Sequence, residues 1–121
     1  MFKKIECVSI YTPDIEASAA FYGGLGLVAA WRIERPLAGG GTATLLGLRF
    51  PDSASSELVL SDNADVKLTE IEILVDDVHD AYVRLSEDQR VGWIREPFAT
   101  ESGHVAVMTA PDGNVFVLVG R

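Results

Sequence analysis

One order of secondary structure elements is predicted twice along this chain, and this internal repeat constrains the fold more than any other feature of the sequence. Alternating apolar residues, separated by turn residues, predict a strand, a helix and three further strands in each half. The predicted strands are residues 4–11, 27–34, 42–50 and 57–61 in the first half and residues 68–75, 93–95, 104–109 and 115–119 in the second. Sliding the chain by about 63 residues superposes Ile10 on Ile73 and Asp14 on Asp77. Because each half would bury its helix poorly alone, the repeat predicts two modules that need each other.

Each predicted helix begins after an aspartate and carries an apolar stripe. Asp14 and Asp77 suit the N-cap position, because a carboxylate there accepts a hydrogen bond from a helix amide that has no other partner. The stripes at helical spacing are Ile15, Ala19 and Tyr22 in the first helix, and Val78, Ala81, Tyr82 and Leu85 in the second. The first helix is expected to end at Gly23-Gly24, which supplies a residue that can take a positive φ.

The amino-acid composition limits the classes of function. Eighteen Asp and Glu against ten Lys and Arg give a formal net charge of −8, which disfavours nucleic acids and anionic membrane surfaces as partners. The sequence shows no signal peptide and no apolar stretch near the ~20 residues of a membrane helix, so we expect a cytoplasmic protein. With 121 residues, 48% of them hydrophobic, we expect one domain with modules at about 1–64 and 65–121. The single cysteine, Cys7, excludes an intrachain disulfide.

Two stretches of this repeat resemble motifs of a known superfamily. The first is the run 14–22 followed by Gly24-Leu25-Gly26-Leu27, and the second is Ala110-Pro111-Asp112-Gly113-Asn114. They resemble the first helix with its Leu-Gly-Leu turn, and the Asp-Pro-Asp-Gly-Asn turn before the last strand, of the vicinal oxygen chelate superfamily. That superfamily contains glyoxalases, bleomycin-resistance proteins and dioxygenases. The resemblance covers essentially the whole chain and implies an α+β fold, in which two βαβββ modules form U-shaped, mostly antiparallel sheets.

The resemblance also implies where a metal ion would bind. Metal-dependent members hold a divalent ion with His and Glu side chains from four strands, because such ions need imidazole and oxygen donors that converge on one point. Matched to this chain, the four positions fall at Cys7, Val59, Glu70 and Val117. Valine cannot coordinate a metal, so we expect no metal ion and no cofactor. Glu57, Glu70 and His104 form the one non-standard metal set that the sequence offers.

Strand alternation then predicts which residues share the concave face with these positions. Ser9 and Tyr11 have the parity of Cys7, Glu57 has that of Val59, and Glu72 has that of Glu70. The strand residues of the opposite parity are apolar, and we expect them to pack under the helices. Two tryptophans are expected in strands that border the concavity, and Phe98 in a loop beside it. The candidate ligand-binding residues are Cys7, Ser9, Tyr11, Trp31, Glu57, Val59, Glu70, Glu72, Trp93, Phe98, His104 and Val117.

These residues favour one function and leave two alternatives open. Carboxylates beside aromatic rings suit a cationic or aromatic ligand, so we expect a metal-independent small-molecule binding protein that resembles the drug-sequestering bleomycin-resistance proteins. The first alternative is a metal-dependent enzyme similar to the glyoxalases or extradiol dioxygenases. The second is a metal-free enzyme in which Glu70 or Glu72 acts as a general base, with Glu70 the candidate catalytic residue. The resemblance also implies a homodimer, because members commonly pair modules between chains.

Overall fold

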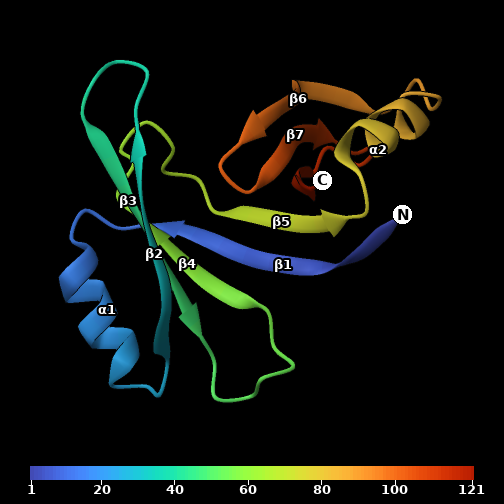
Figure 1. The fold of residues 1–121 in the computed structure, drawn as a ribbon. Helices are drawn as coiled ribbons and strands as arrows, with labels where there is room; N and C mark the ends of the chain where they lie inside the picture. Colours follow the sequence, from blue (N-terminus) through green and yellow to red (C-terminus); the bar gives the residue numbers. More distant parts are fainter. The chain divides into compact units, whose positions relative to one another are not determined.

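A computed structural model describes all 121 residues, which form two compact units. Residues 7–69 form one, called the N-unit, and residues 1–6 with 70–121 form the other, called the C-unit. The N-unit contains the end of β1 (Phe2–Tyr11), then α1 (Ile15–Gly23), β2 (Val28–Pro36), β3 (Thr42–Arg49) and β4 (Glu57–Ser61) (Figure 1). The C-unit contains the start of β1, then β5 (Glu70–Val75), α2 (Val78–Leu85), β6 (Gly92–Thr100), β7 (Gly103–Thr109) and β8 (Val115–Gly120). The predicted order of elements is therefore confirmed in both halves.

The N-unit is a sheet with strand order β2-β3-β4-β1 and a helix packed on one face. β1 and β4 pair in parallel, with Ser9 opposite Val59, and the other two pairs are antiparallel. The buried cluster under α1 consists of Ile15, Leu46, Leu48 and Leu60, with Ile10 and Leu58 packed against it. Of these residues, Ile10, Leu58 and Leu60 have the parity that was predicted to lie under the helix.

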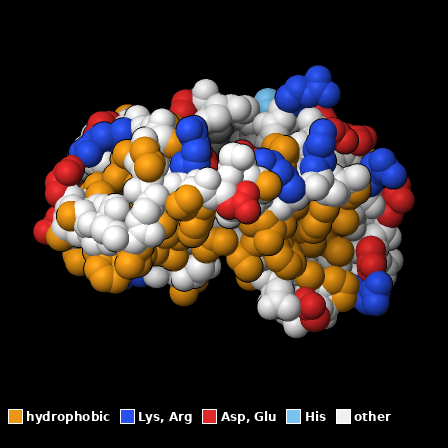
Figure 2. Space-filling view, turned by 90° about the horizontal axis from the view of Figure 1, so that it is seen from below, with side chains coloured by type: hydrophobic (Ala, Val, Ile, Leu, Met, Phe, Trp, Pro, Cys, Tyr) orange, Lys and Arg blue, Asp and Glu red, His pale blue; other side chains and the backbone are white.

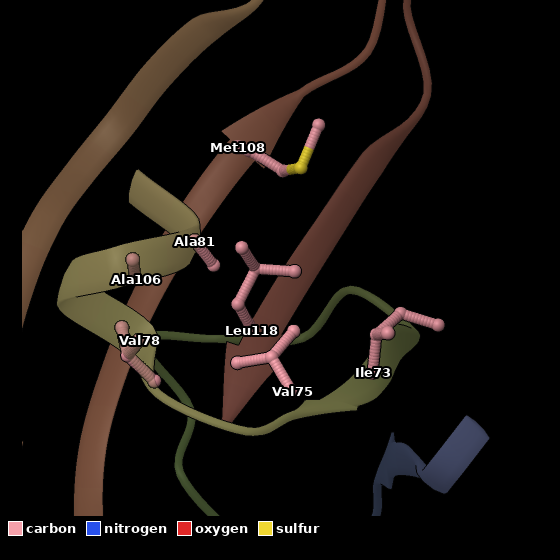
Figure 3. Packing of buried hydrophobic residues seen from close by; sticks show 7 residues of the cluster. All are labelled: Ile73, Val75, Val78, Ala81, Ala106, Met108 and Leu118. Carbon is pink, nitrogen blue, oxygen red and sulfur yellow. The ribbon is translucent and has the colours of Figure 1, made fainter. Parts of the chain in front are cut away.

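The C-unit repeats this arrangement with strand order β5-β8-β7-β6. β5 and β8 pair in parallel, with Glu72 opposite Val117, and the other two pairs are antiparallel. Figure 3 shows the buried cluster beneath α2, which consists of Ile73, Val75, Val78, Ala81, Ala106, Met108 and Leu118. The apolar parity predicted for β5 and β8 is confirmed, because Ile73 and Leu118 belong to this cluster.

Both helices begin as their capping residues predict. The Asp14 carboxylate accepts a hydrogen bond from the amide of Ala17 at 3.0 Å, and the Asp77 carboxylate accepts one from the amide of Asp80 at 2.9 Å. The end of α1 differs in detail from the prediction, because Gly24 keeps a helical φ of −64° and the left-handed residue is Gly26, at 103°. Neither helix is long and apolar enough to cross a membrane.

Candidate functional site on the helix-free faces

Each unit has one sheet face covered by its helix and an opposite face, called here the helix-free face. In the N-unit, the strand register places Trp31, Gly47, Val59 and Ser9 in one row across β2, β3, β4 and β1. Val59 and Ser9 are buried in this row, as is the neighbouring Cys7. The half-buried Tyr11 follows on β1, with the Lys67 ammonium 5.4 Å from its ring centroid. The residues predicted from the first half therefore do share one face.

Trp31 is held in place on this face by two features of its surroundings. Its indole Nε1 donates a hydrogen bond to Oε1 of Glu57 at 2.8 Å. Its ring lies against Gly47, where any Cβ would overlap the indole, so only glycine allows this close approach of ring to strand. The pair of Trp31 and Glu57, separated by 26 residues in sequence, is thus a fixed aromatic and carboxylate pair next to Val59.

The equivalent row of the C-unit has a different chemistry. The register aligns Arg95, Val107, Val117 and Glu72 across β6, β7, β8 and β5. The guanidinium carbon of Arg95 lies 4.1 Å from the ring centroid of Phe98, which stands opposite Val105 on the same face. Glu70 and Glu72 are half-buried and have the parity opposite to the core residue Ile73. Arg95 was not among the predicted site residues, although it occupies the position that corresponds to Trp31.

Trp93 was expected on the helix-free face, but it lies on the opposite face, under α2. It stands opposite Met108 and packs against the core under α2. Its indole donates a hydrogen bond to Ser86 Oγ at 3.0 Å, and its ring contacts that of Tyr82 with centroids 4.7 Å apart. The cause is a β-bulge between Trp93 and Arg95, which inserts one extra residue into β6. As a result, Trp93 and Arg95 lie on opposite faces of the sheet, although simple alternation would put them on the same face.

His104 also lies on the helix side of the C-unit sheet. It has the parity of Ala106 in the buried core, and its ring contacts His79 on α2 with centroids 4.8 Å apart. Its Nδ1 atom is buried and has no hydrogen-bond partner. The predicted non-standard metal set of Glu57, Glu70 and His104 is therefore wrong. His104 cannot join Glu70, because the two side chains lie on opposite faces of one sheet.

The residues at the four metal positions do not fit a divalent ion. Val59 and Val117 are buried hydrocarbon side chains on the helix-free faces, where they offer no lone pair. The structure brings no group of three or more His, Cys, Asp or Glu side chains into an arrangement that could hold a metal ion. Of the four positions, only Cys7 and Glu70 carry a donor atom, which is fewer than the three or four protein ligands of a usual site.

Comparison with known proteins agrees with the repeat and the motifs. The model of the Glyoxalase/Bleomycin resistance protein/Dioxygenase superfamily matches residues 4–118. A hypothetical protein from Bacillus halodurans C-125 has a similar structure, with a TM-score of 0.74, 18% identity and coverage of 98% of this chain and 94% of that chain. No curated protein matches the chain.

Methylmalonyl-CoA epimerases share the fold as well. A selenomethionine structure of one has a TM-score of 0.75, with 17% identity and coverage of 97% of this chain and 94% of that chain. A variant of the Streptomyces coelicolor enzyme, in complex with 2-nitronate-propionyl-CoA, has a TM-score of 0.69, with 17% identity and coverage of 99% and 98%. At such low sequence identity, the structural similarity shows the fold alone. It confirms the predicted α+β class of two βαβββ modules. The chain belongs to the Glyoxalase/Bleomycin resistance protein/Dioxygenase superfamily.

Proposed function

We propose that this chain binds a small organic molecule with a cationic, aromatic character, and that it does so without a divalent metal ion. The observation that carries the proposal is the fixed pair of Trp31 and Glu57 beside Val59, a position where metal-dependent relatives are expected to carry a ligand. An aromatic face next to a carboxylate attracts a cation through the ring quadrupole and through charge. The net charge of −8 favours the approach of a cationic ligand over that of an anionic one.

The geometry of the pair supports binding because it is set before a ligand arrives. The Glu57 hydrogen bond and the contact with Gly47 already restrict the indole, so little side-chain entropy remains to be lost on binding. Only Oε1 of Glu57 accepts from the indole, which leaves Oε2 of the same carboxylate for a ligand cation. The two groups together therefore offer a flat apolar surface and a negative charge at one place.

The two tryptophans provide a matched test. A Trp93→Phe variant keeps Trp31 as its only indole reporter, and a Trp31→Phe variant keeps Trp93, which packs under α2. Titration with benzyltrimethylammonium and with metal-free bleomycin is expected to change the fluorescence of Trp93→Phe and to leave that of Trp31→Phe unchanged. Glu57→Gln keeps an acceptor for the indole but removes the charge, so its affinity for the cation is expected to fall about tenfold.

Three outcomes would contradict the proposal. A flat titration of Trp93→Phe with both probes removes its basis. One divalent ion per chain in elemental analysis of purified protein would favour the metal-dependent alternative. Binding of propionyl-CoA would favour a ligand like that of the epimerase structure.

A further inference from the structure

We propose that Arg95, stacked on Phe98, is the anchor for a carboxylate group of a small organic ligand. This inference rests on the proposed function for the idea that a helix-free face binds organic molecules, and it assigns a carboxylate-binding group to the helix-free face of the C-unit. The two repeats differ in the chemistry of their helix-free faces. Where the N-unit row carries Trp31 with an acidic partner, the C-unit row carries a cation on an aromatic ring.

Two β-bulges are needed to place this pair. β6 has register shifts on both sides of Arg95, one between Trp93 and Arg95 and one between Arg95 and Phe98. Simple alternation would put Arg95 and Phe98 on opposite faces, because three positions separate them. The second bulge brings Phe98 opposite Val105, on the face of Arg95 and Val107. Bulges that re-aim side chains in this way are common beside functional sites.

The contact with the Phe98 ring orients the Arg95 guanidinium for binding a planar acceptor such as a carboxylate. With its central carbon 4.1 Å from the Phe98 centroid, the guanidinium lies over the ring, and Phe98 is itself half-buried. A stacked guanidinium uses its π-face for the ring and keeps the N–H donors at its edge, in the fork geometry that matches a carboxylate. The ring thus restricts a long flexible side chain without consuming its hydrogen bonds.

The protein supplies Arg95 with no carboxylate of its own. Arg95 takes part in none of the ion pairs, although acidic residues outnumber basic ones by 18 to ten. The adjacent Glu96 instead accepts a hydrogen bond from the Tyr82 hydroxyl at 2.7 Å. Glu72 lies in the same row but three strands away, about 14 Å at the usual spacing of roughly 4.8 Å per strand. The positive charge is therefore available to an anion from outside.

The test is an NMR titration of the full chain with benzoate, with benzyl alcohol as the neutral analogue and inorganic phosphate as the alternative anion. The Nε–Hε signal of Arg95 is assigned by its absence in Arg95→Gln. Benzoate is expected to shift this signal and the backbone amides around Val105 and Val107, whereas benzyl alcohol is not. In Arg95→Gln, the benzoate affinity read from these amides is expected to fall about tenfold or more.

Arg84→Gln is the matched control, because Arg84 is exposed on α2 and its loss changes the net charge equally. It is expected to bind benzoate as the unchanged chain does, and circular dichroism melts check that both variants fold. The proposal is overturned if benzoate causes no shift, if Arg95→Gln binds it equally well, or if phosphate binds as tightly as benzoate. The Trp31 response to benzyltrimethylammonium, followed separately, reports on the proposed function, so failure of either idea is distinguishable from failure of the other.

Discussion

Gly47 decides where the Trp31 ring can lie. Because any Cβ at this position would overlap the indole, Gly47→Ala is expected to displace the ring and to break its hydrogen bond with Glu57. Overpacking of this kind costs about 1–3 kcal/mol of unfolding free energy. Urea denaturation measures the loss, and in a Trp93→Phe background the emission of Trp31 is expected to move to longer wavelength. Gly39→Ala is the control, since a Cβ there meets nothing within 4 Å, and equal effects of the two substitutions would refute the role of Gly47.

His104 carries a polar atom that the fold leaves without a partner. A buried nitrogen without a hydrogen bond costs free energy, so His104→Phe, which keeps an aromatic ring beside His79, is expected to raise the unfolding free energy by about 1 kcal/mol. His79 is exposed, so His79→Phe serves as the comparison and is expected to change the unfolding free energy little. Thermal melts of both variants measure the difference. A lower stability of His104→Phe than of the unchanged chain would contradict this expectation.

At the scale of elements, the sequence predicts the order of strands and helices because local chemistry sets it. Asp14 and Asp77 mark the helix starts, and alternation identifies the apolar faces of β4, β5 and β8. The bulges of β6 are not visible in alternation, since they depend on pairing with β7. The sequence therefore predicts a short strand at 93–95, with Trp93 facing the ligand, whereas β6 extends from Gly92 to Thr100 and presents Arg95.

The two helix caps should contribute similarly to stability. Asp14→Ala and Asp77→Ala each remove an acceptor for an amide in the first turn and are expected to lower the unfolding free energy by about 1 kcal/mol. Asn at the same positions keeps an acceptor oxygen, so Asp14→Asn and Asp77→Asn are expected to retain most of the stability. Chemical denaturation of the four variants provides the measurement, and equal losses for Ala and Asn would rule out the capping role.

A carboxyl group in the turn after α2, that of Asp88, makes the unfolding free energy depend on pH in the acid range. The hydrogen bonds from Arg90 lower the pKa of Asp88 from its usual 3.8 to about 2. A carboxyl whose pKa is lower in the folded chain stabilises the fold above its unfolded pKa, and that contribution is lost as the pH falls from about 4 towards 2. Asp88→Asn is therefore expected to lose less stability over this range than the unchanged chain, as measured by denaturation at several pH values. Parallel pH profiles would contradict this.

At the scale of the whole molecule, apolar surface supports the proposal of a homodimer. Phe21, Leu25 and Val28, at the end of α1 and the start of β2, are each 64% exposed, and apolar side chains cover much of the face in Figure 2. Three large apolar side chains with this much exposed surface, at the end of α1 and the start of β2, suit an interface. Light scattering is expected to give twice the 13.1 kDa mass of the chain. The measured mass is expected to fall to that of one chain when Phe21 and Leu25 are both replaced by Ser.

The control for the dimer is a second pair of exposed apolar residues in the other unit. Val83 and Ile94 are 61% and 59% exposed, so replacing both by Ser removes a comparable apolar surface from the C-unit. If the second copy covers the end of α1, this variant keeps the dimer mass. A loss of dimer in both variants would place the interface on both units, and a single-chain mass for the unchanged protein would exclude the dimer at the concentration measured.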